Sequence, residues 1–153
     1  MKYDTATPYI ASYLLVKKEG KIAFLLRANT SWMNDHYGVA AGKVEEGESY
    51  TQAAIREAKE EVGITIRPEN LRQIMTCHRR EHGETMSWVD VVFEVAKWEG
   101  EVTNAEPHMH SALDWFALDD LPENVIPSQR FMLEQILAGK DYCEYGWEVE
   151  KTD

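Results

Sequence analysis

The sequence predicts an α/β fold in which strands form a mixed sheet between two helices. Two observations support this fold class. Several short segments are rich in aliphatic and aromatic residues and alternate with turn-like pieces, as strands do. Two other segments, around residues 49–63 and 128–137, carry apolar residues at the spacing of amphipathic helices. No repeat, linker or low-complexity stretch divides the 153 residues, so we expect a single domain over residues 1–153.

The part of the chain before residue 42 is predicted to contain a hairpin and a short strand. Residues 9–16 (YIASYLLV) and 21–27 (KIAFLLR) flank the turn-like piece KKEG and are expected to pair. Residues 28–36 are mostly polar and predict a loop. We expect residues 37–41 to form a short strand that leads into Gly42.

Two further strands are predicted at residues 71–78 and 88–96, joined by a charged loop. In the second of them, apolar and acidic residues alternate. This alternation predicts that Asp90 and Glu94 lie on the opposite side of the strand from Val89, Val91 and Phe93.

The end of the chain is predicted to add a short strand at 113–117 and a helix at 128–137. The apolar side of this helix is expected to be formed by Phe131, Leu133, Ile136 and Leu137, with Ser128 as its N-cap. The tail from 139 to 153 is acidic and aromatic, and the pattern assigns no role to it.

Composition excludes several classes of partner. The net charge of −11 argues against long RNA or DNA, whose binding needs a basic surface, and is compatible with a small phosphorylated molecule that brings metal ions. Cys77 and Cys143 form neither a disulfide framework nor a metal-ligand pair, so we expect two small buried residues. No apolar run has membrane-spanning length and no signal peptide is visible. These features predict a soluble cytoplasmic protein that does not bind membranes.

The most informative segment of the chain is residues 42–64, GKVEEGESYTQAAIREAKEEVGI. In a helix, Glu57, Glu60 and Glu61 lie on one face, because residues three and four apart are neighbours. Three crowded carboxylates repel one another unless a cation lies among them, and a hard divalent ion such as Mg²⁺ or Mn²⁺ prefers oxygen ligands. The alternative is a solvated acidic face, which is what most glutamate runs are.

The residues around the glutamates favour the metal-binding alternative. Ser49 and Gln52 have the spacing of a capping box, and Gly63 is placed to end the helix in a left-handed turn. The helix therefore has a defined start and end, and an apolar side opposite the acidic one. That apolar side is formed by Ala54, Ile55, Ala58 and Val62.

This segment resembles the signature G-x5-E-x7-R-E-U-x-E-E-x-G-U of the Nudix hydrolases, where U is aliphatic. The later part of the chain is similar to the MutT-like branch, because Trp115 begins a stretch resembling its W-x-x-L-x-x-L/P element. The resemblance implies an α/β/α sandwich with the mixed sheet in the middle. The residues that match the signature are Gly42, Glu48, Arg56, Glu57, Ala58, Glu60, Glu61, Gly63 and Ile64.

The resemblance also implies roles for individual residues. Glu60, Glu61 and the backbone carbonyl of Gly42 are expected to bind metal. Glu57 is expected either to bind metal or to act as the general base, and a single sequence does not separate the two roles. Glu48 and Arg56 are expected to form an ion pair that braces the loops around the helix.

A further metal ligand is expected from the loop after the strand at 88–96. Glu106 lies at the position of a metal-binding glutamate in MutT-like proteins, and Glu101 is the competing candidate. For each of them, an ordinary surface acid is the alternative.

Substrate-binding residues are predicted with less support from the pattern. Arg27 leaves a strand near the expected metal site and is a candidate for phosphate binding, or for pairing with one of the many acids. His36 lies in a loop that borders the base pocket in many relatives, although a plain surface loop fits as well. Asp119 is either a helix cap or a base-binding group. His108 and His110 have the spacing of half a zinc site, but no third ligand is placed to complete it.

The sequence thus predicts an enzyme that uses Mg²⁺, or Mn²⁺, to hydrolyse a diphosphate linkage in a small nucleotide. The first hypothesis is conversion of a (deoxy)nucleoside triphosphate to a monophosphate and pyrophosphate. The alternatives are hydrolysis of a nucleoside diphosphate that carries a sugar or another group, and a regulator that binds nucleotides without catalysis. The sequence is compatible with a monomer or a homodimer.

Overall fold

The computed structural model describes residues 4–147 and contains one mixed sheet with a helix on each side. Its strands are β1 (Tyr9–Lys18), β2 (Lys21–Arg27), β3 (Tyr37–Gly38), β4 (Ala40–Lys43), β5 (Arg72–Arg79), β6 (Trp88–Val95), β7 (His110–Phe116) and β8 (Tyr142–Tyr145). Its helices are α1 (Tyr50–Val62), α2 (Pro127–Leu137) and the short 3₁₀ turn η1 (Pro68–Asn70).

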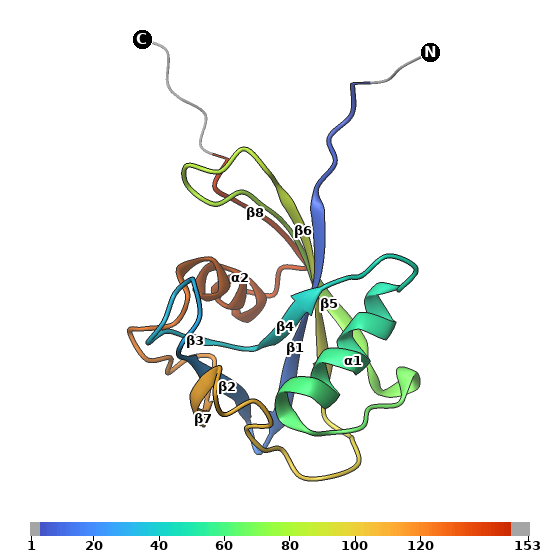
Figure 1. Cartoon of the computed structure of the whole chain (residues 1–153), viewed down its shortest axis with the longest axis vertical. Coiled ribbons are helices and arrows are strands. Elements are labelled where there is room, and N and C mark those ends of the chain that lie inside the picture. Colours follow the sequence, from blue (N-terminus) through green and yellow to red (C-terminus); the bar gives the residue numbers. More distant parts are fainter. Residues whose placement is uncertain (1–3, 148–153) are drawn as a thin grey trace.

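The sheet follows the order β3-β2-β1-β6-β5-β8, with β4 paired to β1 and β7 paired to β2. The β1–β6 and β5–β8 pairs are parallel and the other strand pairs are antiparallel. Figure 1 shows α1 and α2 on opposite sides of the central strands. This arrangement is the α/β/α sandwich, so the predicted fold class is confirmed.

Strand β1 shows why the apolar runs of this sequence are continuous. Its residues Ala11 to Val16 are all buried. Ala11, Tyr13 and Leu15 belong to the core under α2, whereas Leu14 and Val16 belong to the core under α1. A strand covered on both faces needs apolar side chains at nearly every position.

Strand β6 carries a buried charge that its alternating pattern did not predict. Val91 and Phe93 belong to the core under α1, whereas the Asp90 side chain is fully buried and paired with Arg79 of β5. Because both faces of the sheet are covered, the alternation of apolar and acidic residues does not mark a solvent face.

The second helix also starts differently from the prediction. Helix α2 begins at Pro127 with Ile126 as N-cap, and Ser128 is a buried residue inside the first turn. Proline at the first helical position lacks only an N–H that would have no partner there, and its φ angle suits a helix. The predicted serine cap was therefore wrong by two residues.

The other differences are in strand boundaries. The segment 37–41 forms two short strands separated at Val39, and the strand predicted at 113–117 begins earlier, at His110. The tail, to which the pattern assigned no role, contributes the edge strand β8, which lies parallel to β5. In this pair Cys77 and Cys143 are register partners, and both are buried free thiols, as expected. None of the helices within residues 4–147 has the length and apolarity needed to cross a membrane.

Candidate active site

Helix α1 has both predicted ends. The Ser49 hydroxyl accepts from the backbone N–H of Gln52 at 3.1 Å, and the Gln52 side chain accepts from the N–H of Ser49 at 2.8 Å. Gly63 ends the helix with a φ angle of 74°. The capping box and the left-handed end fix where the helix starts and stops, and therefore which way its glutamates point.

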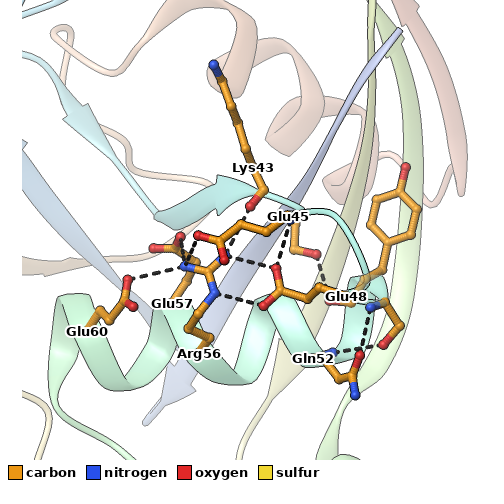
Figure 2. Close-up of polar contacts among 10 residues, drawn as sticks. Lys43, Glu45, Glu48, Gln52, Arg56, Glu57 and Glu60 are labelled. Carbon is orange, nitrogen blue, oxygen red and sulfur yellow. Dashed lines mark hydrogen bonds and ion pairs between the residues drawn. The ribbon is translucent and has the colours of Figure 1, made fainter. Parts of the chain in front are cut away.

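Arg56 connects the acidic face of α1 to the loop that precedes the helix (Figure 2). Its guanidinium donates to both carboxylate oxygens of Glu48, at 2.8 and 3.0 Å, and to the backbone carbonyl of Lys43 at 3.1 Å. A third nitrogen, Nη1, donates to Glu57 at 2.7 Å and to Glu60 at 3.2 Å. One side chain therefore holds loop and helix together through planar, two-pronged contacts that arginine alone can make.

The same contacts change the titration of Glu48. Its hydrogen bonds with Arg56, followed by one from the backbone N–H of Glu45, lower its pKa to about 2. The hydrogen bond to Glu48 in turn raises the pKa of Arg56. Both groups are therefore charged over the whole physiological pH range.

Glu57 lies against the backbone of Gly42. The Glu57 residue is buried, and a Cβ atom on Gly42 would come within 2.0 Å of its Oε1 atom. Only glycine leaves room for this carboxylate. Burial raises the pKa of Glu57, an effect partly offset by the hydrogen bond from Arg56.

Glu61 is held by the strand that leads into the helix. Its Oε2 atom accepts from the backbone N–H of Ala41 at 2.9 Å. Burial, and then the charge of Glu57, raise its pKa well above the ordinary value. Glu60 differs from both, because about half of its side chain is exposed and its only described contact is with Arg56.

Glu106, rather than Glu101, approaches this face. Its charge contributes to the raised pKa of Glu57 and of Glu61. The loop is tied to the helix end, because the N–H of Ala105 donates to the carbonyl of Glu61 at 3.0 Å. Glu101 lines a separate groove with Lys18 and Lys21.

The donor set fits a hard divalent cation. The negative charge of Glu106 adds to the raised pKa of both Glu57 and Glu61, and a metal ion would relieve that repulsion through the oxygen ligands it prefers. In residues 4–147, no three acidic, histidine or cysteine side chains already stand in a metal-binding arrangement. Figure 2 shows that Arg56 engages Glu57 and Glu60, two glutamates of the acidic face.

A pocket of about 540 Å³ adjoins the acidic face. Gly42 and Glu61 line it on the side of the glutamates, and Arg27 and Lys43 add positive charge. Tyr13, Val39 and Ile126 are among its apolar lining residues. Its size and its mixture of charged and apolar walls suit a small molecule that has an anionic part and an apolar part.

Comparison with known proteins decides the family. The model of the NUDIX domain matches residues 7–136, which is most of the chain. The chain belongs to the NUDIX family. Helix α1 lies inside the matched range, and the assignment of residues 42–64 as the Nudix box stays a prediction.

Individual relatives of this Nudix chain differ in length and in name. It is 33% identical over 115 residues to the NAD-capped RNA hydrolase NudC of Klebsiella pneumoniae, covering 75% of this chain but only 42% of that protein. It is 28% identical over 125 residues to the CTP pyrophosphohydrolase of Escherichia coli, covering 81% and 87%. The crystal structure of a MutT NUDIX hydrolase from Burkholderia pseudomallei superimposes with a TM-score of 0.76 at 29% identity, covering 85% and 98%.

Of the three residues predicted to bind substrate, only Arg27 lines the pocket. Arg27 lines the pocket, where its side chain donates to the carbonyl of Trp32 at 2.9 Å and to the Thr30 hydroxyl at 3.2 Å. His36 contacts the carbonyl of Asn34 at 3.0 Å, and Asp119 is exposed after β7. Neither His36 nor Asp119 is among the residues that line the pocket.

The pocket has two buried polar residues whose positions the sequence pattern did not predict. Arg79 donates to Asp90 at 2.6 Å and to Glu81 at 2.9 Å, and its guanidinium lies 4.7 Å from the centre of the Trp88 ring. Gln129 of α2 is the second residue. The contact between Gln129 and Val39 joins segments 90 residues apart, whereas these contacts of Arg79 lie within the β5–β6 pair and the loop between its strands.

The two histidines considered for zinc are not part of a described metal cluster. His110 is buried beside Arg27 in the β2–β7 pair, and burial lowers its pKa. Its Nδ1 atom is the only fully buried side-chain nitrogen or oxygen within residues 4–147 that lacks a hydrogen-bond partner.

Proposed function

We propose that this Nudix chain hydrolyses a diphosphate linkage in a small nucleotide with the help of Mg²⁺, or Mn²⁺ in its place. The substrate class we favour is a (deoxy)nucleoside triphosphate, which would give a monophosphate and pyrophosphate. The observation that carries the proposal is that Glu61 of α1 lines a pocket which Arg27 and Lys43 also line. A carboxylate for a metal and cations for phosphate then lie around one cavity.

The proposed ligands are Glu60, Glu61, Glu106 and the carbonyl of Gly42, with Glu57 either as a further ligand or as the base. A bound divalent ion would neutralise phosphate charge and lower the pKa of a coordinated water. In the reaction, the water oxygen forms a bond to phosphorus while the bridging P–O bond breaks. The proton of the water passes to the base, and the leaving phosphate departs as an anion.

The remaining charged residues would position these groups. Arg56 and Glu48 would keep the loop at Gly42 against the helix, so that the glutamates point at the cavity. Arg27 and Lys43 would bind the phosphates, since both line the cavity. The charge of Arg27 offsets a small part of the burial-driven rise in the pKa of Glu61, which supports a role for this cation near the proposed metal ligands.

The relatives support hydrolysis of a nucleotide-containing substrate, but they do not support one particular substrate. The names NAD-capped RNA hydrolase, CTP pyrophosphohydrolase and bis(5'-nucleosyl)-tetraphosphatase describe three different nucleotide-containing substrates. The net charge of −11 favours a small nucleotide over a long nucleic acid. Hydrolysis of a nucleoside diphosphate joined to a sugar or another group is the second candidate, because the pocket is open to solvent and would admit an extension.

A substrate panel tests the proposal. The purified protein is incubated with Mg²⁺ or Mn²⁺ and with nucleoside triphosphates, oxidised triphosphates, ADP-ribose, nucleotide sugars or dinucleoside polyphosphates, and the products are separated. Pyrophosphate and a monophosphate from triphosphates would support the favoured class. Metal binding without turnover of any of these compounds would contradict it and favour a nucleotide-binding regulator.

A further inference from the structure

The side chain of Gln129 has a fixed orientation in the wall of the pocket. The Gln129 residue on α2 is 6% exposed and lines the cavity. Its Oε1 atom accepts from the backbone N–H of Val39 at 2.9 Å. Because only the oxygen of an amide accepts a hydrogen bond, this contact settles which end of the amide is the NH₂ group.

The NH₂ group of Gln129, at Nε2, has no hydrogen-bond partner among residues 4–147. In the same residues, His110 Nδ1 is the only fully buried side-chain nitrogen or oxygen without a hydrogen-bond partner, so Nε2 is not fully buried. The Nε2 group is therefore reached from the pocket. A polar donor held in a largely buried position without a protein partner is suited to a ligand.

The backbone around the amide prevents it from turning away. A Cβ atom at Gly38 would lie 3.0 Å from Gln129 Nε2 and 2.9 Å from Cδ1 of Ile126. The amide therefore packs directly against the main chain of β3, in space that only glycine leaves open. The donor is preorganised, so binding a ligand costs little conformational entropy.

The cavity that Gln129 lines has an apolar part beside its charged residues. Ala11, Tyr13, Val39 and Ile126 line the same cavity. A ligand group that matches them is flat and mostly apolar, with a hydrogen-bond acceptor on its edge. A nucleobase has this character, whereas a sugar or a phosphate would leave polar groups unpaired against these walls.

The position of Gln129 relative to the glutamates fits the same ligand. Ala41, whose N–H holds Glu61, lies two residues after Val39, whose N–H holds Gln129. Two residues of chain span at most about 7 Å. This separation suits a nucleotide whose base contacts Gln129 while its phosphates reach the acidic face.

We propose that Gln129 is a specificity-determining residue that donates a hydrogen bond to the carbonyl oxygen at C6 of a purine or C4 of a pyrimidine. The pocket would then favour keto bases, such as hypoxanthine, guanine and uracil, over adenine and cytosine, which present an amino group at that edge. An amino group of the base is itself a hydrogen-bond donor, so it and the NH₂ group of Gln129 would face each other and neither would have an acceptor. This inference rests on the proposed function, because it assumes a nucleotide in this pocket.

Binding of nucleoside monophosphates tests the inference without turnover. IMP differs from AMP, and UMP from CMP, in whether the edge of the ring carries a carbonyl or an amino group. We expect the keto member of each pair to bind about tenfold more tightly by calorimetry, the size expected for one unsatisfied buried donor. Equal affinities within both pairs, or no binding of any of the four, would overturn the inference.

The variant Gln129→Glu reverses the hydrogen-bonding character of the site with almost no change in shape. One carboxylate oxygen still accepts from Val39, and the other presents an acceptor to the pocket. In alkaline buffer, where the carboxyl is ionised, the preference is expected to turn toward AMP and CMP. Gln135→Glu places the same charge on the same helix outside the pocket lining and is expected to keep the wild-type preference. An unchanged preference in Gln129→Glu would contradict the assignment.

A measurement on the wild-type protein covers the case in which Gln129→Glu does not fold. The side-chain NH₂ resonances of Gln129, assigned by NMR, are expected to shift when IMP saturates the protein, and absence of a shift would overturn the inference. The outcomes also separate the two proposals. Base preference in binding without any hydrolysis would uphold the role of Gln129 and refute the enzyme, and hydrolysis without base preference would do the opposite.

Discussion

Glu61 and Gln129, from helices on opposite faces of the sheet, bind the same short segment of main chain. Glu61 accepts from the N–H of Ala41, and Gln129 accepts from the N–H of Val39, each at 2.9 Å. Strand β4 pairs with β1 on one side, and these two side chains take backbone donors that strand pairing does not use. The segment therefore sets the acidic face and the pocket wall in a fixed relation to each other.

The substitution Glu61→Gln tests the metal face directly. We expect turnover to fall by at least about 100-fold, because the variant lacks a charged ligand. The fold should be retained, since the oxygen of glutamine can still accept from Ala41. In buffer with a chelator, the melting temperature should equal or exceed that of the wild type, because burial and Glu57 disfavour the ionised carboxylate.

The control for this substitution is Glu46→Gln, an exposed glutamate in the loop before α1. It removes the same charge without touching the proposed ligands and should leave turnover unchanged. Near-normal Mg²⁺-dependent activity of Glu61→Gln would rule out its assignment as a metal ligand.

Arg56→Lys tests whether the shape of the guanidinium, and not only its charge, organises the site. An ammonium group cannot reach Glu48, Glu57 and the Lys43 carbonyl together, so we expect a loss of about 2 kcal/mol in the free energy of unfolding. We also expect activity to fall by about 10- to 100-fold, as for residues that orient metal ligands. Urea denaturation and steady-state kinetics measure the two effects. Arg72→Lys, at an exposed arginine 3.9 Å from Glu94, should change neither.

The lowered pKa of Glu48 predicts a pH-dependent contribution to stability. Its ordinary value is 4.5 and its value in the folded protein is about 2, so the unfolded state binds more protons between these limits. The stabilisation is therefore fully present above pH 4.5 and is lost as the pH falls toward 2. The difference in unfolding free energy between the wild type and Glu48→Gln should shrink in that window. A constant difference from pH 6 down to pH 3, measured with urea, would show that the Arg56 contact does not lower this pKa.

Asp90→Asn tests the buried ion pair beneath the pocket. Both Arg79 and Asp90 are buried, and removal of one charge leaves the guanidinium poorly compensated. We expect a loss of about 3 kcal/mol in the free energy of unfolding. Glu99→Gln breaks an ion pair with Arg67 whose side chains are both mostly exposed, and it should cost no more than about 1 kcal/mol. Equal losses in the two variants would contradict the buried pairing.

The fold and the box were predictable because their signals are local. The capping box of Ser49 and Gln52 spans three residues, and the contact between Glu48 and Arg56 spans eight. Strand β8 was not predictable, because its partner β5 lies more than sixty residues earlier in the chain and the tail carries no alternating pattern. The burial of Asp90 was missed for the same reason, since it depends on a helix that covers the sheet from a distant part of the sequence.

The sequence by itself determined the acidic helix, its two ends, its apolar side and the family to which the chain belongs, because hydrogen bonds and helical spacing within a few residues specify them. Only the tertiary structure decided that Gly42 must lack a side chain to accommodate Glu57, that Glu106 and not Glu101 approaches the glutamates, and that Gln129 faces the cavity. These relations join segments far apart in the chain. They follow from how the two helices pack on the sheet, which spacing along the sequence does not encode.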